Sequence, residues 1–314
     1  MNSTPQSWYP MCLSGDLKPG TRRIVRAFEA DWIVFRSESG AAGVLRSTCP
    51  HGGVDLRTGS VQDGHMVCPM HGWRFGTDGH GWHPEQREEC LRIKHLQVEE
   101  HLGVLHAFFG DGEAFPFPKR LPQEKALHTR ASRFDFATPY QMVGMNAFDT
   151  RHLWPVHRRK PTAPPVVQSH SATHISIHYH AAVAGDHLRD RLLRWSGLRE
   201  IEVEVHSYGG SVLVFEHRKV GVYTYLSMMP RGDAGVSVFM AACRERTGHP
   251  LEDLLKRALL GVQGTLMRTF AMEDLEVLRH ARFSTENLDP VLDETPIRWL
   301  DHYQALPRRK ALAG

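Results

Sequence analysis

The sequence is poor in cysteine, carries little net charge and contains no long apolar run. Its five cysteines form no disulfide framework, which is typical of a protein from a reducing compartment. The net charge of +3 indicates no nucleic-acid partner. No apolar stretch of membrane-spanning length or of signal-peptide type occurs, so we expect a cytoplasmic protein without a membrane partner.

Two short pairs of potential metal ligands stand out between residues 48 and 75. The first pair is Cys49-x-His51 and the second is Cys68-x2-His71. Prolines and glycines surround both pairs, so we predict that each pair lies in a tight loop.

These four residues favour an iron–sulfur centre over zinc. Two cysteines and two histidines on facing loops are the ligands of a [2Fe–2S] centre in which imidazoles replace two thiolates on one iron. A closed zinc site can use the same residue types. Zinc fingers place two cysteines together and two histidines together, whereas each pair here is mixed. A zinc-stabilised binding module is therefore the weaker alternative.

The composition changes between residues 110 and 127. Before this segment, residues 21–46 and 98–109 mix β-branched and aromatic residues with polar ones, which predicts a small all-β module. Pro116, Pro118 and Pro122 then exclude a helix and favour an extended connector. We therefore expect two domains, residues 1–115 and residues 116–314.

A second group of potential ligands consists of Asp149, His152 and His157, in a segment with a helical pattern. Two imidazoles and one carboxylate are the ligand set of non-haem Fe(II) oxygenases. Five residues of an ideal helix turn the chain by about 500°, so the two histidines would point apart unless the helix is distorted. Pro155 supplies a cause for a kink. The alternative is a helix capped by Asp149, with solvated histidines.

The rest of the chain predicts an antiparallel sheet followed by a long helix. The β-like runs are joined by short turns, and they span residues 169–181, 201–208, 211–219, 220–229 and 234–244. The first run places four histidines on one face: His170, His174, His178 and His180. For this run, a half-exposed strand with a polar face is favoured over a second metal site.

The long helix, predicted from Pro250 to about Arg282, carries a further candidate ligand. Its expected buried face includes Asp274 among the apolar residues Leu255, Leu259, Leu266, Phe270, Val277 and Leu278. A carboxylate on a buried face is costly unless it is paired or binds a metal. We therefore predict Asp274 as the third ligand of the iron, with a salt-bridged core aspartate as the alternative.

Together these motifs resemble the catalytic α-subunit of the Rieske non-haem iron ring-hydroxylating oxygenases. The layout is similar to the stand-alone 3-ketosteroid 9α-hydroxylase and sterol desaturase type. Residues 49–51, C-P-H, and 68–73, C-P-M-H-G-W, match the Rieske motif, and residues 273–278, E-D-L-E-V-L, are similar to the motif Gln-Asp-Ile-Glu-Ile-Trp around the carboxylate ligand. The resemblance implies an α+β fold, with an N-terminal all-β Rieske [2Fe–2S] domain followed by a helix-grip catalytic domain, an antiparallel sheet around a long helix.

The resemblance also assigns roles to the candidate residues. It implies that one iron of the cluster is held by Cys49 and Cys68, and the other by His51 and His71. A mononuclear Fe(II) would be bound by His152, His157 and Asp274. Asp149 matches the aspartate that links an iron-ligand histidine to a cluster histidine of a neighbouring subunit, which implies a head-to-tail homotrimer.

The expected reaction is hydroxylation of a hydrophobic organic substrate with O2 as co-substrate. A steroid-like molecule is the first hypothesis, and an aromatic one is open. The chain lacks a strand-linked G-x-G-x-x-G motif, so we expect electrons from a separate NAD(P)H-dependent flavin and iron–sulfur reductase or a ferredoxin. cis-Dihydroxylation, demethylation and desaturation share these ligands and stay open. An alternative of another class is an electron-transfer protein whose lipid-binding-like second domain has lost its iron.

Overall fold

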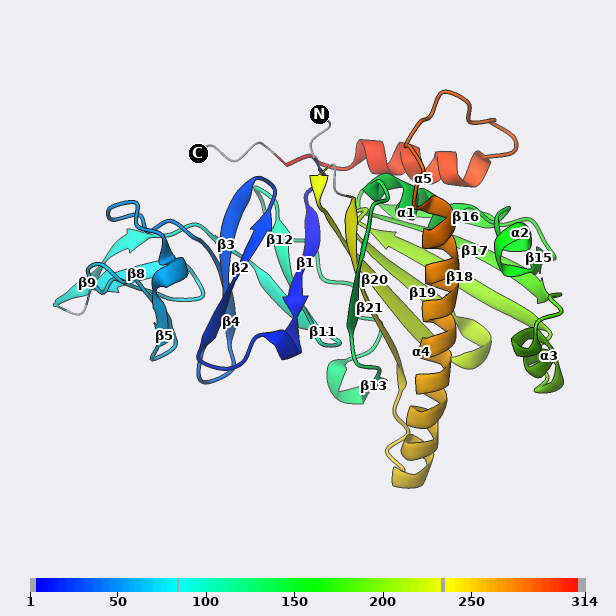
Figure 1. The fold of residues 1–314 in the computed structure, drawn as a ribbon, viewed down its shortest axis with the longest axis horizontal. Coiled ribbons are helices and arrows are strands. Elements are labelled where there is room, and N and C mark those ends of the chain that lie inside the picture. Colours follow the sequence, from blue (N-terminus) through cyan, green and yellow to red (C-terminus); the bar gives the residue numbers. More distant parts are fainter. Residues whose placement is uncertain (1–3, 84, 233–234, 310–314) are drawn as a thin grey trace. The chain divides into compact units, whose positions relative to one another are not determined.

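The computed structural model describes residues 4–83, 85–232 and 235–309, which form two compact units. One unit comprises residues 8–117 with Arg309, and the other comprises residues 4–7 and 118–308. The first is built of β-strands and the second combines a sheet with helices (Figure 1), so the expected α+β class is confirmed. Within the described ranges, none of the helices combines the length and the apolar character that a membrane crossing requires.

The described residues of the first unit form three sheets. The first sheet joins β1 (Ser7–Leu13), β12 (Val104–Phe109) and β11 (Val98–His101). The second joins β2 (Thr21–Ala27), β3 (Ala30–Arg36), β4 (Ala42–Arg46) and β10 (His95–Leu96). The third joins β5 (Ser60–Gln62), β6 (His65–Val67), β7 (Arg74–Phe75), β8 (His80–His83) and β9 (Gln86–Arg92).

The two cysteine–histidine loops share a hydrophobic core with the strands of the first unit. Cys49 and Cys68 are buried in one cluster with Ile33 and Phe35 of β3 and Leu45 of β4. Close packing leaves such side chains little freedom. The core therefore fixes where the two sulfur atoms lie.

The second unit contains a nine-stranded sheet with the order β13-β21-β20-β19-β18-β17-β15, in which β14 also pairs with β21 and β16 with β17. Its strands are β13 (Ala126–His128), β14 (Ser132–Phe136), β15 (Arg159–Pro161), β16 (Val166–Ser171), β17 (His174–Val183), β18 (Glu200–Tyr208), β19 (Val212–His217), β20 (Val222–Pro230) and β21 (Val236–Glu245). The paired strands are antiparallel, as the short connections predicted.

The histidine-rich run at residues 169–181 is not one strand. It contains the end of β16, a turn after Ser171 and most of β17, and Ser171 pairs with His174 across the hairpin. His170 therefore lies beside His174 on a neighbouring strand. The prediction was wrong because strict alternation continues through the turn and hides it.

The described residues form five α-helices: α1 (Tyr140–Phe148), α2 (Leu153–His157), α3 (Leu188–Trp195), α4 (Pro250–Leu278) and α5 (Glu294–Ala305). Figure 1 shows α4 running along the sheet of the second unit, where it contacts β20 and β21. Pro250 occupies its first turn together with Glu252 and Asp253. Proline needs no backbone partner there, and carboxylates stabilise the positive end of the helix.

The buried face of α4 differs from the predicted one. Leu255, Leu259 and Val277 are 63%, 48% and 65% exposed, whereas Leu260 and Leu275 are buried. Apolar residues surround much of this helix, so their spacing alone does not decide which side packs. Asp274 is partly buried on the inward side.

Candidate functional site

The two cysteine–histidine loops have the same backbone geometry. In the first, the amide of Cys49 donates to the carbonyl of Val54 at 2.8 Å, and the amide of Gly53 donates to the carbonyl of Cys49 at 2.9 Å. The second loop repeats both bonds at the same offsets, at 2.8 and 3.1 Å, with Cys68, Trp73 and Gly72. Gly53 and Gly72 have φ of +74° and +75°, the left-handed conformation that favours glycine.

The four candidate ligands of these loops gather at one place. The Nδ1 atoms of His51 and His71 lie 3.2 Å apart and both side chains are exposed, whereas Cys49 and Cys68 are buried. Burial raises the pKa of the Cys49 thiol, so a thiolate there needs a compensating positive charge. A buried sulfur pair below an exposed imidazole pair fits a [2Fe–2S] cluster with mixed ligands.

The segment that carries Asp149, His152 and His157 is a broken helix. α1 ends at Phe148, and Asp149 leaves the helical conformation with φ of −85° and ψ of 117°. Its Oδ1 accepts a hydrogen bond from the amide of Arg151 at 2.7 Å, a local bond that competes with helix formation.

The chain becomes helical again at Leu153. The expected kink at Pro155 is wrong, because this proline lies in the first turn of α2, where its missing N–H has no helical partner to lose. His152 directly precedes α2 and His157 ends it.

His152, His157 and Asp274 converge from α2 and α4. The Nε2 atoms of His152 and His157 lie 3.4 and 2.7 Å from Asp274 Oδ1. The possible ligand atoms of the three residues lie within 4.8 Å of one another. Asp274 Oδ1 is buried, and among the described residues it has no hydrogen-bond partner of suitable geometry. Two imidazoles and a carboxylate directed at one point fit the facial ligand set of a non-haem Fe(II).

A second layer of carboxylates faces the other nitrogens of both rings. Glu273 Oε2 lies 2.9 Å from His157 Nδ1, and Asp149 Oδ2 lies 3.5 Å from His152 Nδ1. Burial raises the pKa of Asp149, but hydrogen bonding and the charge of His152 outweigh it, so the pKa is lowered. Such partners orient metal-binding imidazoles and leave Nε2 available as the ligand atom.

Sequence reasoning missed the support of this centre. Glu273 is marked in the sequence as part of the segment 273–278 that is similar to the family motif, whereas nothing in the sequence pattern marks Arg159 or Asp190. These two form a buried ion pair at 2.7 Å, and Arg159 Nη1 also donates to the carbonyl of His157 at 3.1 Å. Arg159 and Asp190 are 31 residues apart in the sequence, so no local pattern indicates that they form a pair.

A cavity of about 230 Å³ opens beside the three converging residues. His152, His157 and Asp274 lie in its wall, together with apolar side chains from the sheet and α4 such as Leu213, Leu226, Val238, Met240, Leu266 and Phe270. A predominantly apolar wall with few polar groups is typical of a site for a hydrophobic small molecule.

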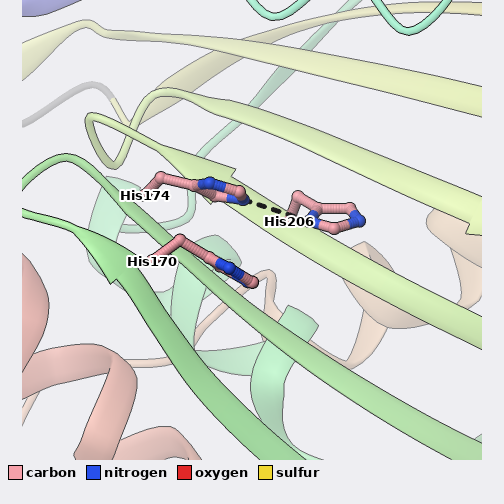
Figure 2. A group of neighbouring side chains, drawn as sticks. All are labelled: His170, His174 and His206. Carbon is pink, nitrogen blue, oxygen red and sulfur yellow. Dashed lines mark hydrogen bonds between the residues drawn. The ribbon is translucent and has the colours of Figure 1, made fainter.

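The histidine group on the sheet has a different environment. Figure 2 shows His170, His174 and His206 side by side on three strands, on the face opposite to the core. His174 Nε2 lies 3.1 Å from His206 Nδ1, and His170 Nε2 lies 2.8 Å from Ser176 Oγ. The Arg120 guanidinium contacts the remaining nitrogen of His206. The positive charge of Arg120 would repel a metal ion bound to these histidines. We therefore retain the interpretation of a polar strand face.

Comparison with known proteins identifies the family of the first part of the chain. Residues 7–97 match the family described as the Rieske [2Fe–2S] domain. Chlorophyllide a oxygenase of Arabidopsis thaliana is 32% identical over 147 residues, which are 46% of this chain and 27% of that protein. The 4β-methylsterol monooxygenase of Methylococcus capsulatus is 25% identical over 224 residues, which are 65% of this chain and 60% of that protein. The chain spans about a quarter of the length of the chlorophyllide oxygenases that it matches.

Solved structures show the same fold over nearly the whole chain. The terminal oxygenase of carbazole 1,9a-dioxygenase from Nocardioides aromaticivorans has a TM-score of 0.71 at 16% identity, covering 98% of this chain and 96% of that one. Dicamba monooxygenase bound to dicamba has a TM-score of 0.60 at 16% identity, covering 97% of each chain. At this identity the likeness concerns the fold alone.

Proposed function

We propose that this chain, a Rieske oxygenase by its matched domain, its relatives and its fold, uses O2 and externally supplied electrons to hydroxylate a hydrophobic organic substrate. One observation carries the proposal: an apolar cavity opens onto His152, His157 and Asp274, whose ligand atoms converge. This arrangement combines a binding site for an apolar molecule with a three-ligand iron site that leaves positions free.

The cofactors follow from the family and from the two groups of ligands. We assign the [2Fe–2S] cluster to Cys49, His51, Cys68 and His71, and the mononuclear Fe(II) to His152, His157 and Asp274. When bound, the cluster supplies single electrons and the mononuclear iron activates O2. We also assign residues 1–115 to the cluster domain and residues 116–314 to the catalytic domain.

The chain's own side chains orient the ligands and exclude water. Asp149 and Glu273 face the Nδ1 atoms of His152 and His157, which fixes the ring orientation. Apolar walls keep bulk water from the reacting bond. Rieske oxygenases generally work with a separate reductase or ferredoxin. The bridge from Asp149 to a neighbouring subunit, the homotrimer and the cytoplasmic location stay predictions.

The substrate and the outcome of the reaction are open within this proposal. Similarity to the 4β-methylsterol monooxygenase over 65% of the chain supports a steroid-like substrate as the first hypothesis. cis-Dihydroxylation, demethylation and desaturation use the same ligands. The rival, an electron-transfer protein with an inactive second domain, is disfavoured because its second unit would have no reason to keep three converging ligands.

Iron content and turnover test the proposal together. Reconstituted wild-type protein is expected to hold one iron per chain more than Asp274→Ala, with equal acid-labile sulfide and equal cluster absorbance. Glu276→Ala, which removes an exposed carboxylate from the same helix, is the matched control and should keep all its iron. Oxygen uptake with a surrogate reductase and a panel of apolar substrates should be lost only in Asp274→Ala. Equal iron content in all three proteins contradicts the assignment.

A further inference from the structure

The apolar cavity contains polar atoms that the proposed iron site does not use. Three of them are buried and have no hydrogen-bond partner within the described part of the chain: His217 Nε2, Thr224 Oγ1 and Gln263 Oε1. A buried polar group without a partner costs about 1 to 3 kcal/mol. Such a group in the wall of a binding cavity indicates that a ligand supplies the missing bond.

The strand register brings two of these residues together. His217 of β19 pairs with Val222, and Phe215 pairs with Thr224 of β20. Residues two positions apart on a strand share one face, so His217 and Thr224 are diagonal neighbours on the cavity side of the sheet.

The third residue comes from the helix that covers this part of the sheet. Leu260 of α4 packs in one cluster with Val222, the strand partner of His217. Gln263 follows Leu260 by three residues and therefore lies on the same face of α4. All three unpartnered atoms thus belong to one end of the cavity.

This polar end lies far from the proposed iron ligands. Gln263 and Asp274 are eleven residues apart on α4, which is about 16 Å along a helix that rises 1.5 Å per residue. Apolar side chains such as Leu266 and Phe270 fill the wall between them. A molecule that reaches both ends must be elongated and apolar along its middle.

The charges around the polar end select an uncharged group. Burial lowers the pKa of His217 to about 4, so its imidazole is neutral near pH 7. The described cavity wall contains one lysine and one arginine, and both are already paired: Lys219 with Glu200 at 2.6 Å, and Arg159 with Asp190 at 2.7 Å. A carboxylate would therefore find no free counter-charge. Gln263 Oε1 only accepts, whereas neutral imidazole and hydroxyl can donate.

We propose that His217, Thr224 and Gln263 bind a hydroxyl group at the end of an elongated apolar substrate remote from the bond that is oxidised. The hydroxyl donates to Gln263 Oε1 and accepts a hydrogen bond from His217 or Thr224. The identification of the oxidised end of the substrate rests on the proposed function. The binding of the hydroxyl group does not depend on turnover. The group sets the orientation of the substrate, since a reversed molecule would bury its hydroxyl among apolar side chains.

Calorimetric titration of the reconstituted protein with matched probes tests this inference. The probes are 5α-androstan-3β-ol, the hydrocarbon 5α-androstane and 5α-androstane-3β-carboxylate. Two net hydrogen bonds of about 0.5 to 1.5 kcal/mol each predict that the alcohol binds about 5-fold to 150-fold more tightly than the hydrocarbon. Equal affinity for both, or tighter binding of the carboxylate, overturns the proposal.

Variants separate the polar end from the fold and from the iron. Thr224→Val keeps the shape of the side chain, and His217→Leu and Gln263→Leu remove the other two polar groups. Each is expected to reduce the preference for the alcohol several-fold while the hydrocarbon binds at least as well, with unchanged circular dichroism. A preference that survives in all three contradicts the assignment. Asp274→Ala should keep the preference for the alcohol, because the polar end does not depend on the iron. If the wild type prefers the alcohol but binds no mononuclear iron, the proposed oxygenase function is refuted and the proposed hydroxyl site is still supported.

Discussion

Loss of the Arg159–Asp190 ion pair is expected to destabilise the second unit strongly. Arg159 Nη2 and Asp190 Oδ1 lie 2.7 Å apart, and their side chains are only 2% and 0% exposed. Arg159 also donates to the carbonyl of His157, so the pair holds the end of α2 from which a candidate iron ligand projects. The two residues come from β15 and α3.

Asp190→Ala leaves a buried guanidinium without its counter-charge. Removal of one partner of a buried pair costs about 3 to 5 kcal/mol. For a unit of this size, each kcal/mol lowers the melting temperature by about 2 to 4 °C, which gives a decrease of about 6 to 20 °C. Thermal unfolding followed by circular dichroism measures the decrease. Iron content by mass spectrometry is expected to fall as well, because the carbonyl of His157 loses its orientation.

An exposed ion pair provides the matched control. Glu294 and Arg298 lie 3.8 Å apart with side chains 66% and 49% exposed, and such pairs contribute less than about 1 kcal/mol. Glu294→Gln should therefore lower the melting temperature by no more than about 4 °C. The double variant Arg159→Leu/Asp190→Leu is expected to recover part of the lost stability. If Asp190→Ala melts no lower than Glu294→Gln, the reasoning from burial is refuted.

Three further predictions concern acid stability, the second carboxylate and the packing of α1. Burial lowers the pKa of four histidines to about 3 or about 4, below the unfolded value of 6.5; they are His106, His174, His206 and His217. The free energy of unfolding should therefore fall as the pH decreases from 6.5 to 4. A denaturation midpoint that stays constant over this range contradicts the prediction. Glu273→Ala is expected to weaken Fe(II) binding about 10-fold to 100-fold, measured by anaerobic titration, and an unchanged affinity would show that the contact with His157 is incidental. Gly144→Ala would place a methyl group 2.1 Å from the Trp299 ring and should cost about 1 to 3 kcal/mol in chemical denaturation, whereas Gly261→Ala, with no neighbour within 4 Å, should not destabilise.

The ligands of both proposed metal sites could be predicted because their signals are local. Cysteines and histidines beside glycine and proline define the two loops within a few residues. The break after Phe148, where Asp149 Oδ1 accepts a hydrogen bond from the amide of Arg151, was not predicted. The prediction of Asp274 rests on an expected buried face that is partly wrong, because Leu255 and Leu259 of that face are exposed. The carboxylate still lies inward.

The rest of the site depends on contacts that a sequence pattern does not record. His217 and Thr224 become neighbours only through the register of β19 and β20, and Gln263 joins them only through the packing of α4. The pair of Arg159 and Asp190 likewise depends on how β15 and α3 meet. Register and helix rotation are set by the whole core, which no window of a single chain contains.

The repeated turn in the first unit bears on how its iron is acquired. Each loop is closed by main-chain bonds at Cys49 and Cys68 that involve no ligand side chain. The main chain therefore determines the conformation of both loops. We expect the cluster to be inserted into loops that are already folded, in contrast to a zinc finger, which folds only when the metal binds. Protease resistance of this region should then be acquired during synthesis, before any iron is delivered.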